Sequence, residues 1–141
     1  MEITPEVQKQ LDEQKKECIF CKLIKGEIPS SQVYEDKFML GVLDINPIVE
    51  GHTLLMPKEH YPIMPYIPEK TFFHMFGMLP KILDVYCKKL YSIEANVFIA
   101  NGGVAGQQSN HFMMHILPRN GKDKLGNKFS FGNFAIVFLN K

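Results

Sequence analysis

The longest regular pattern of apolar positions runs over residues 69–91, where large apolar side chains recur at intervals of three and four residues. This spacing places them on one side of an α-helix, so the segment is predicted to be one long helix. Pro80 lies inside the run, and because proline cannot donate a backbone hydrogen bond, we expect it to kink or split the helix. A short polar helix is predicted from Thr4, a capping residue followed by Pro5, to about Lys16.

Shorter apolar runs bounded by turn residues predict strands. The expected strands cover residues 32–35, 38–44, 52–57, 96–100 and 109–117. The first two are expected to form a hairpin across Asp36 and Lys37, and the C-terminal FAIVFL is a candidate late strand. The predicted class is therefore α+β, an antiparallel sheet of about five strands with one long helix and a short N-terminal helix. The expected organisation is a helical extension at 1–17, a domain at 18–120 and a tail at 121–141.

Composition narrows the functional classes. The 141 residues include 45% hydrophobic and 22% charged side chains, ordinary values for a globular domain. A net charge of +1 gives no strong field toward nucleic acid or an anionic membrane, so neither is expected as a partner. The first residues are too charged for a signal peptide and no apolar run reaches membrane-spanning length, so we expect a cytoplasmic protein.

Cys18 and Cys21 form a CxxC pair, which has three interpretations. A redox pair of the thioredoxin type would need a preceding strand, and the preceding segment is predicted to be a polar helix. Two unligated core thiols are the second interpretation. Half of a zinc site is the third, and His60 and His111 are candidates to complete a Cys2His2 set. Spacing alone does not specify the distant half of such a site.

Two further segments are candidates for ligand binding. Residues 101–108, NGGVAGQQ, form a glycine-rich loop whose backbone amides can approach an anion, although a plain flexible hairpin loop has the same composition. Asp44 ends an apolar strand, and it is either a simple strand terminator or an acceptor for the hydroxyls of a diol. Apolar neighbours that could line a pocket beside it are Phe20, Val42, Leu43 and Ile45.

Residues 111–119 read HFMMHILPR. In a strand, alternate residues share a face, so His111, Met113 and His115 are expected on the same side of the sheet. The segment has the pattern of an alternating histidine trio in which methionine occupies the middle position.

These segments together resemble the histidine-triad (HIT) family of nucleotide hydrolases and transferases, in particular its small zinc-bearing homodimers. The matching stretches are CIFCKLIKGEIPSSQVYED, LDINPIVEGHTLLMPKEH, NGGVAGQ and the strand ending in HILPR. They occur in order over about residues 18–120. The resemblance implies a homodimer with the two sheets joined across a two-fold axis.

The resemblance also implies a role for each matching residue. It places zinc on Cys18, Cys21, His60 and His111. It places a purine nucleotide against Ile19, Phe20, Val42 and Ile45 at the base, Asp44 at the ribose hydroxyls, and Asn101, Gly106, Gln107 and Gln108 at the phosphates. His115 would face the phosphates, and His52 would orient the nucleophile from behind.

Met113 departs from the family pattern at the nucleophile. The family attacks the α-phosphorus with the middle histidine and forms a nucleotidyl-imidazole that water then cleaves. A thioether cannot support this intermediate, because it has no proton to exchange and is only a weak acceptor. Gln108 also stands where the family often has a small hydroxyl residue. We therefore expect an AMP-like nucleotide to bind with little or no turnover, either in a natural pseudoenzyme or in a nucleophile-substituted form of an active enzyme. The alternatives are a hydrolase that works without the usual nucleophile and a purely structural zinc protein.

Overall fold

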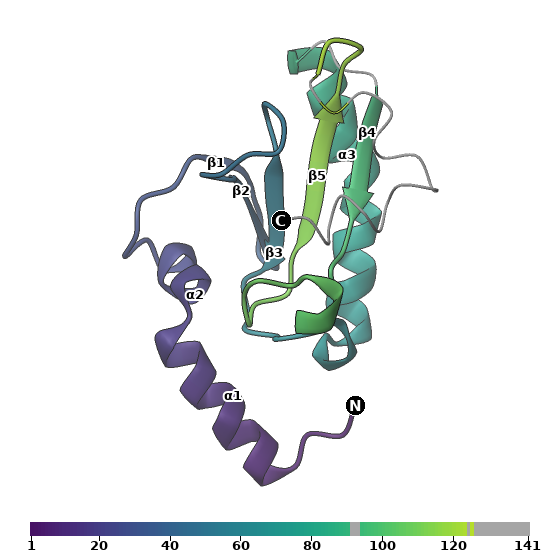
Figure 1. The fold of residues 1–141 in the computed structure, drawn as a ribbon. Helices are drawn as coiled ribbons and strands as arrows, with labels where there is room; N and C mark the ends of the chain where they lie inside the picture. Colours follow the sequence, from purple (N-terminus) through teal and green to yellow (C-terminus); the bar gives the residue numbers. More distant parts are fainter. Residues whose placement is uncertain (91–93, 124, 126–141) are drawn as a thin grey trace.

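A computed structural model of the chain describes residues 1–90, 94–123 and 125, and its centre is a five-stranded antiparallel sheet in the order β1-β2-β3-β5-β4 (Figure 1). The strands are β1 (Gln32–Glu35), β2 (Met39–Leu43), β3 (Thr53–Pro57), β4 (Glu94–Phe98) and β5 (Met114–Arg119). The predicted α+β class is confirmed. The FAIVFL segment lies outside the described residues.

Within the described residues, three α-helices accompany the sheet. They are α1 (Pro5–Glu17), α2 (Ile19–Ile24) and α3 (Glu69–Leu90), and two short 3-10 turns cover Met64–Tyr66 and Gly103–Ala105. In Figure 1, α3 runs along one side of the sheet, while α2 lies on the other side and α1 extends away from it. The sequence predicted α1 and α3 but did not predict α2, which positions the CxxC pair.

The predicted break in the long helix is partly wrong, because α3 continues through Pro80 as one element. Pro80 cannot donate to the carbonyl of Phe76, four residues earlier. Both residues are exposed, so water can reach that carbonyl. The 22-residue helix also packs along its length on the sheet, which outweighs the cost of one missing hydrogen bond.

The central strands β2, β3 and β5 are buried on both faces, which explains why they are almost continuously apolar. On the α3 side, Met39 and Leu55 join a core cluster with Met75 and Ile82 of the helix. On the opposite side, Leu40 of β2 belongs to a second cluster. Its other members are Val42, Leu54, Met56 and Met113, covered by Phe20, Leu23 and Ile24 of α2.

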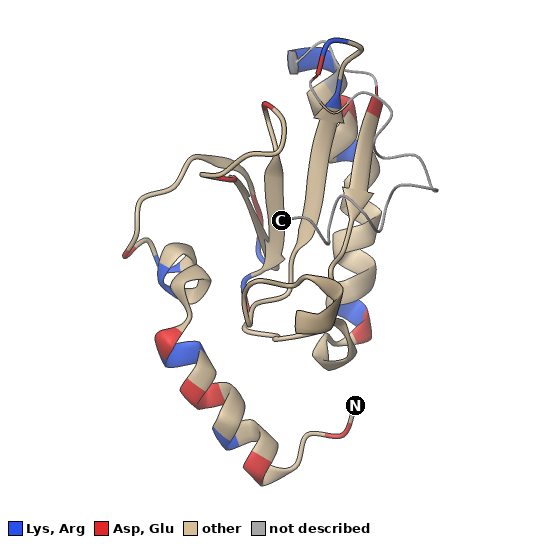
Figure 2. Cartoon of the chain, in the orientation of Figure 1, with Lys and Arg blue, Asp and Glu red and all other residues tan. Residues whose placement is uncertain are grey.

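The N-terminal helix is held by few contacts. Thr4 caps it by accepting a hydrogen bond from the Val7 amide at 3.3 Å, as predicted, and Leu11 is its one buried residue. Lys15 forms a 3.0 Å ion pair with Glu59, which connects α1 to the turn after β3. Figure 2 shows that charged residues gather on α1 and near the ends of the strands and of α3. None of the described helices is both long and apolar enough to cross a bilayer.

Candidate functional site

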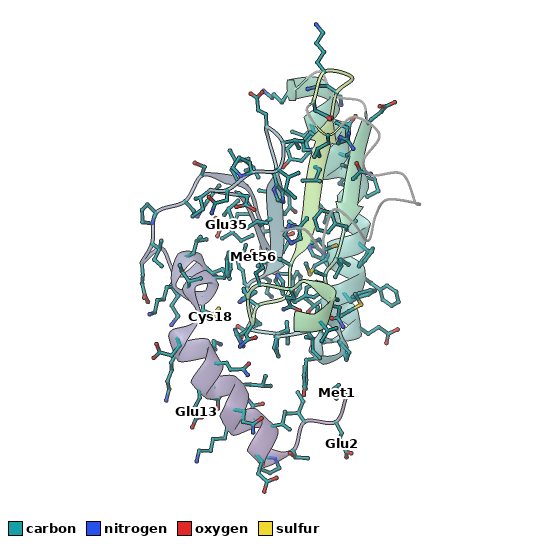
Figure 3. All side chains as sticks on the ribbon, in the orientation of Figure 1. Met1, Glu2, Glu13, Cys18, Glu35 and Met56 are labelled. Carbon is teal, nitrogen blue, oxygen red and sulfur yellow. The ribbon has the colours of Figure 1, made fainter. Side chains whose placement is uncertain are left out.

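Cys18, Cys21, His60 and His111 come together although they lie in three separate parts of the sequence. Cys18 caps the start of α2 and Cys21 lies in its first turn, while His60 follows β3 and His111 precedes β5. Figure 3 shows Cys18 at the junction between α1 and α2. One ligand atom from each residue lies within 4.8 Å of every other, and all four side chains are at most 9% exposed.

The imidazole of His111 is oriented toward the two sulfurs. Its Nε2 donates to the carbonyl of Pro57 at 2.8 Å, so Nδ1 carries the lone pair. Nδ1 lies 3.5 Å from Cys18 Sγ and 3.6 Å from Cys21 Sγ, and His60 Nδ1 lies 3.3 Å from Cys21 Sγ. Sulfur and nitrogen ligands of one tetrahedral zinc ion are about 3.6 Å apart, so the spacing fits this metal.

The electrostatics of the cluster also fit a cation. Burial, with the neighbouring Cys18, raises the pKa of Cys21 to about 12, so a thiolate there needs a compensating positive charge. Burial lowers the pKa of His111 to about 4 and also lowers that of His60, which keeps both rings neutral and able to ligate. The buried His60 Nε2 has no hydrogen-bond partner within the described residues.

The predicted fifth strand begins later than expected. Residues 109–113 lie outside β5, whose first residue is Met114. The His111 amide donates to Ser109 Oγ, and the Phe112 amide donates to the Tyr61 carbonyl rather than to a neighbouring strand. The predicted alternation of sides along this segment still holds, because Phe112 packs in the core beneath α3 while Met113 faces the apolar cluster beneath α2.

A cavity of about 510 Å³ lies beside the apolar cluster beneath α2. Its lining includes these residues with predicted roles: Ile19, Phe20, Asp44, Ile45, His52, Gly106, Gln107, Gln108, Met113 and His115. Six further residues, which the sequence did not indicate, also line it: Asn46, Ile48, Leu54, Phe98, Ala100 and Ser109. Leu54, Phe98 and Ala100 are apolar and lie in or just after strands, so their pattern resembles that of ordinary core positions.

Three residues predicted for the pocket do not line the cavity: Val42, Leu43 and Asn101. Val42 is 2% exposed and belongs to the core beneath α2, where Phe20 covers it. The Asn101 side chain accepts a hydrogen bond from the Met64 amide at 2.7 Å, which fixes the loop to the start of a 3-10 turn. The roles of Val42 and Asn101 in nucleotide binding therefore stay predictions, since neither residue lines this cavity.

Gln107 fixes the shape of the glycine-rich loop. Its side-chain oxygen accepts from the Gly102 amide, and its nitrogen donates to the carbonyls of Pro62 and Ser109. Gly102 and Gly106 have φ values of 94° and 92°, which favour glycine. Because its side-chain amide is occupied by backbone groups, Gln107 can shape a phosphate site but has little capacity left to bind the phosphate.

Asp44, His52 and His115 form a polar row along one wall of the cavity. His52 is 2% exposed; its Nε2 lies 3.0 Å from His115 Nδ1, and its Nδ1 lies 3.4 Å from Asp44 Oδ2. The Ile48 amide donates to His52 Nδ1 at 3.2 Å. The His115 ring stacks on Phe98 with 4.5 Å between centroids and 2° between planes.

The tautomers of this row follow from the backbone contact. If Nδ1 of His52 accepts from Ile48, its Nε2 carries the hydrogen and donates to His115 Nδ1. His115 then carries its own hydrogen on Nε2 and offers a donor. Among the described residues that line the cavity there is no Lys or Arg, and the loop carrying the glycines is uncharged in Figure 2. An anion bound here would thus rely on imidazole and backbone donors.

The fold and site define an α+β domain with a buried Cys2His2 cluster beside an imidazole-lined cavity of ligand size. The family model for the HIT domain matches residues 25–122, and the chain belongs to this family.

Relatives and solved structures agree with this assignment. An uncharacterized HIT-like protein of Methanocaldococcus jannaschii is 43% identical, over 88% of this chain and 94% of the relative. The adenosine 5'-monophosphoramidase of Saccharomyces cerevisiae is 34% identical, over 72% of this chain and 62% of that enzyme. A zinc-bound histidine triad family protein from Mycobacterium smegmatis has a TM-score of 0.74 and 31% identity, covering 89% of this chain and 91% of that one.

Proposed function

We propose that this protein is a zinc-containing HIT protein that binds a purine nucleotide of the AMP type and has lost, or nearly lost, the covalent hydrolase reaction. The observation that carries the proposal is the position of Met113. It lines the cavity together with His115, where the family resemblance expects the nucleophilic histidine.

The chemistry of Met113 supports the loss of turnover. A nucleotidyl-enzyme intermediate needs a side chain that attacks phosphorus and then leaves, and a thioether does neither efficiently. Removing a covalent nucleophile lowers turnover by about 10⁴-fold or more in well-studied enzymes. His115 is tied to His52 and stacked on Phe98, so it is not free to swing into the missing position.

The cavity supports nucleotide binding. Ile19 and Ile45 are 57% and 93% exposed at its rim, and a bound base would cover this apolar surface. Asp44 lies on the adjoining wall, where a carboxylate can accept two ribose hydroxyls. At the phosphate end, His115 can donate through Nε2. The exposed Gln108 and the backbone of Gly106 complete that end.

The zinc proposal rests on the fit of Cys18, Cys21, His60 and His111 described above. The Pro57 carbonyl that orients His111 is the kind of outer contact that fixes the ligand tautomer in zinc sites. The metal would be structural, since four protein ligands leave no open position. It would join α2 to the loops before and after the central strands.

Calorimetry and turnover test the two parts of the proposal separately. We expect AMP to bind the native chain, and we expect Met113→His to raise hydrolysis of an adenosine phosphoramidate by several orders of magnitude, because it supplies the nucleophile. Met113→Leu is the matched control, and it should bind AMP within a few fold and stay inactive. Absence of AMP binding would exclude the nucleotide site, while rapid turnover by the unaltered chain would exclude the loss of chemistry.

The row of Asp44, His52 and His115 favours a second candidate function, direct attack by water. In that case His52 Nδ1 donates its hydrogen to Asp44 at 3.4 Å, and His52 Nε2 accepts a hydrogen bond from His115 Nδ1. His115 Nε2 then carries no hydrogen and can act as a base. Direct attack inverts the configuration at phosphorus, whereas the two-step family mechanism retains it. Inversion with a chiral phosphorothioate substrate, together with loss of the activity in His115→Ala, would support this candidate.

The expected homodimer, the domain limits of 18–120 and a cytoplasmic location also remain proposals. The exposed apolar residues Phe73, Phe76 and Val85 on α3 support a self-association surface.

A further inference from the structure

Replacement of a histidine by Met113 also changes what the cavity can ligate. His52 Nε2 and His115 Nδ1 lie 3.0 Å apart, and the Met113 side chain lines the same cavity two residues from His115. Asp44, His52 and His115 offer ligand atoms that all lie within 4.8 Å of one another. This group is separate from the Cys2His2 cluster.

We propose that His52, His115 and Met113 form a binding site for a cuprous ion, with Asp44 orienting His52. Two imidazole nitrogens and one thioether are a neutral ligand set; imidazole suits copper, and the soft thioether favours its cuprous state. Asp44 counters the charge of the ion. The proposal goes beyond the proposed function, which requires neither copper nor any ligand role for Met113.

The spacing of the two nitrogens allows a shared metal ion. Two nitrogens bound to one first-row metal at about 2.0–2.1 Å and a tetrahedral angle are about 3.4 Å apart. The observed 3.0 Å separation therefore has to open by only a few tenths of an ångström. The ion takes the place of the single hydrogen that the two rings otherwise share.

The surroundings of His52 supply the necessary tautomer. When Nε2 binds a metal, Nδ1 must carry the hydrogen and needs an acceptor. Asp44 Oδ2 lies 3.4 Å from Nδ1, which gives the carboxylate–histidine–metal arrangement that orients metal-binding imidazoles. In this state His52 gives up its contact with the Ile48 amide and turns its hydrogen to Asp44. Phe98, stacked on His115, holds the second ring in place.

The experiment monitors Met113 itself, because Cu(I) could also bind the sulfurs of Cys18 and Cys21 in the Cys2His2 cluster. The full chain is labelled with [¹³C-methyl]methionine and titrated anaerobically with Cu(I), supplied as its bicinchoninate complex. Native mass spectrometry counts zinc and copper per chain. We expect one copper ion to bind while zinc is retained, and the Met113 methyl resonance, assigned by its absence in Met113→Leu, to shift. Met56, fully buried in the same apolar cluster, should not shift.

Variants separate the proposed site from other histidines. His115→Ala and Met113→Leu should each weaken copper binding at least tenfold while retaining their zinc, which shows that they fold. His74→Asn alters a histidine outside both clusters and should leave copper binding unchanged. Copper uptake that leaves the Met113 resonance in place, or that requires loss of zinc, would overturn the proposal. The copper titration contains no nucleotide, so its outcome does not depend on whether AMP binds.

Discussion

Asp36 connects the turn between β1 and β2 to the long helix. Its carboxylate accepts hydrogen bonds from Tyr34 and His74 at 2.7 and 2.6 Å and from the amides of Phe38 and Met39 at 2.7 and 2.9 Å. Burial alone would raise the pKa of Asp36, but these four donors prevail and lower it from 3.8 to about 2. The residue therefore stabilises the fold only in its charged form.

We expect Asp36→Asn to destabilise the protein by about 2 kcal/mol at pH 7, since one pKa unit corresponds to about 1.4 kcal/mol. The folded pKa lies below the unfolded value, so this contribution is present above about pH 4 and disappears as the pH falls through about 2. Urea denaturation of both proteins across this range measures the difference. Asp84→Asn, which breaks only an exposed pair with Lys88, should cost less than about 0.5 kcal/mol. Equal effects of the two substitutions would contradict the role given to Asp36.

At the scale of secondary structure, α3 contains two residues that oppose helix formation. Pro80 and Gly77 both lie on its exposed side, and a Cβ at Gly77 would meet no atom within 4 Å. Proline costs about 3 kcal/mol and glycine about 1 kcal/mol relative to alanine in a helix interior. The helix forms because its opposite side packs on the sheet.

We therefore expect Pro80→Ala to stabilise the protein by about 2 kcal/mol, since it restores a backbone hydrogen bond while the unfolded chain regains some freedom. Gly77→Ala should stabilise it by about 1 kcal/mol. Thermal unfolding of the two variants and of their combination provides the measurement. A loss of stability in Pro80→Ala would mean that the proline fits a local distortion of α3 that alanine does not keep.

The short helix α2 depends on its connections more than on its length. Six residues are too few to form a stable helix alone, and α2 is held by Phe20, Leu23 and Ile24 and by the two cysteines. If the cysteines bind zinc, chelation should loosen α2 and the adjoining α1 before the sheet. We expect a strong chelator to increase amide hydrogen exchange at residues 5–24 with little change in β3. The double variant Cys18→Ser, Cys21→Ser should not respond to the chelator.

The sequence predicted most elements because each has a strong local signal. Thr4 with Pro5 marked the start of α1, and the spacing from Phe72 onward marked α3. The helix at residues 19–24 gave no such signal, since a single turn and a half shows no usable periodicity. The beginning of β5 was misplaced because the Phe112 amide donates to the Tyr61 carbonyl instead of to a neighbouring strand, a contact that only the tertiary structure creates.

The candidate site was predictable only where its chemistry is unusual. Cysteines and histidines are rare enough to be noticed, and the family resemblance grouped them correctly in space. Phe98 and Leu54 resemble ordinary strand residues, so their place in the cavity could not be inferred. The contact between His52 and His115 likewise depends on the pairing of Leu54 with His115 across β3 and β5, which no local pattern specifies.

At the scale of the whole molecule, apolar surface remains on one side of the sheet. Phe73 and Val85 are 61% and 52% exposed on α3, and Val97 is 38% exposed on β4, the last strand in the sheet order. A sheet edge and an adjoining apolar helix favour association with a second sheet. The homodimer expected from the family resemblance would cover both features at once.

We expect the full chain to sediment as a dimer and Phe73→Glu to shift it to a monomer, because the substitution places a charge on the apolar surface of α3. Val104→Glu is the matched control, since Val104 is fully exposed on the glycine-rich loop and away from α3. Sedimentation velocity at several concentrations, with circular dichroism to verify folding, provides the measurement. A monomeric native chain, or a dimer that Phe73→Glu leaves intact, would contradict a role of the exposed α3 side chains in self-association.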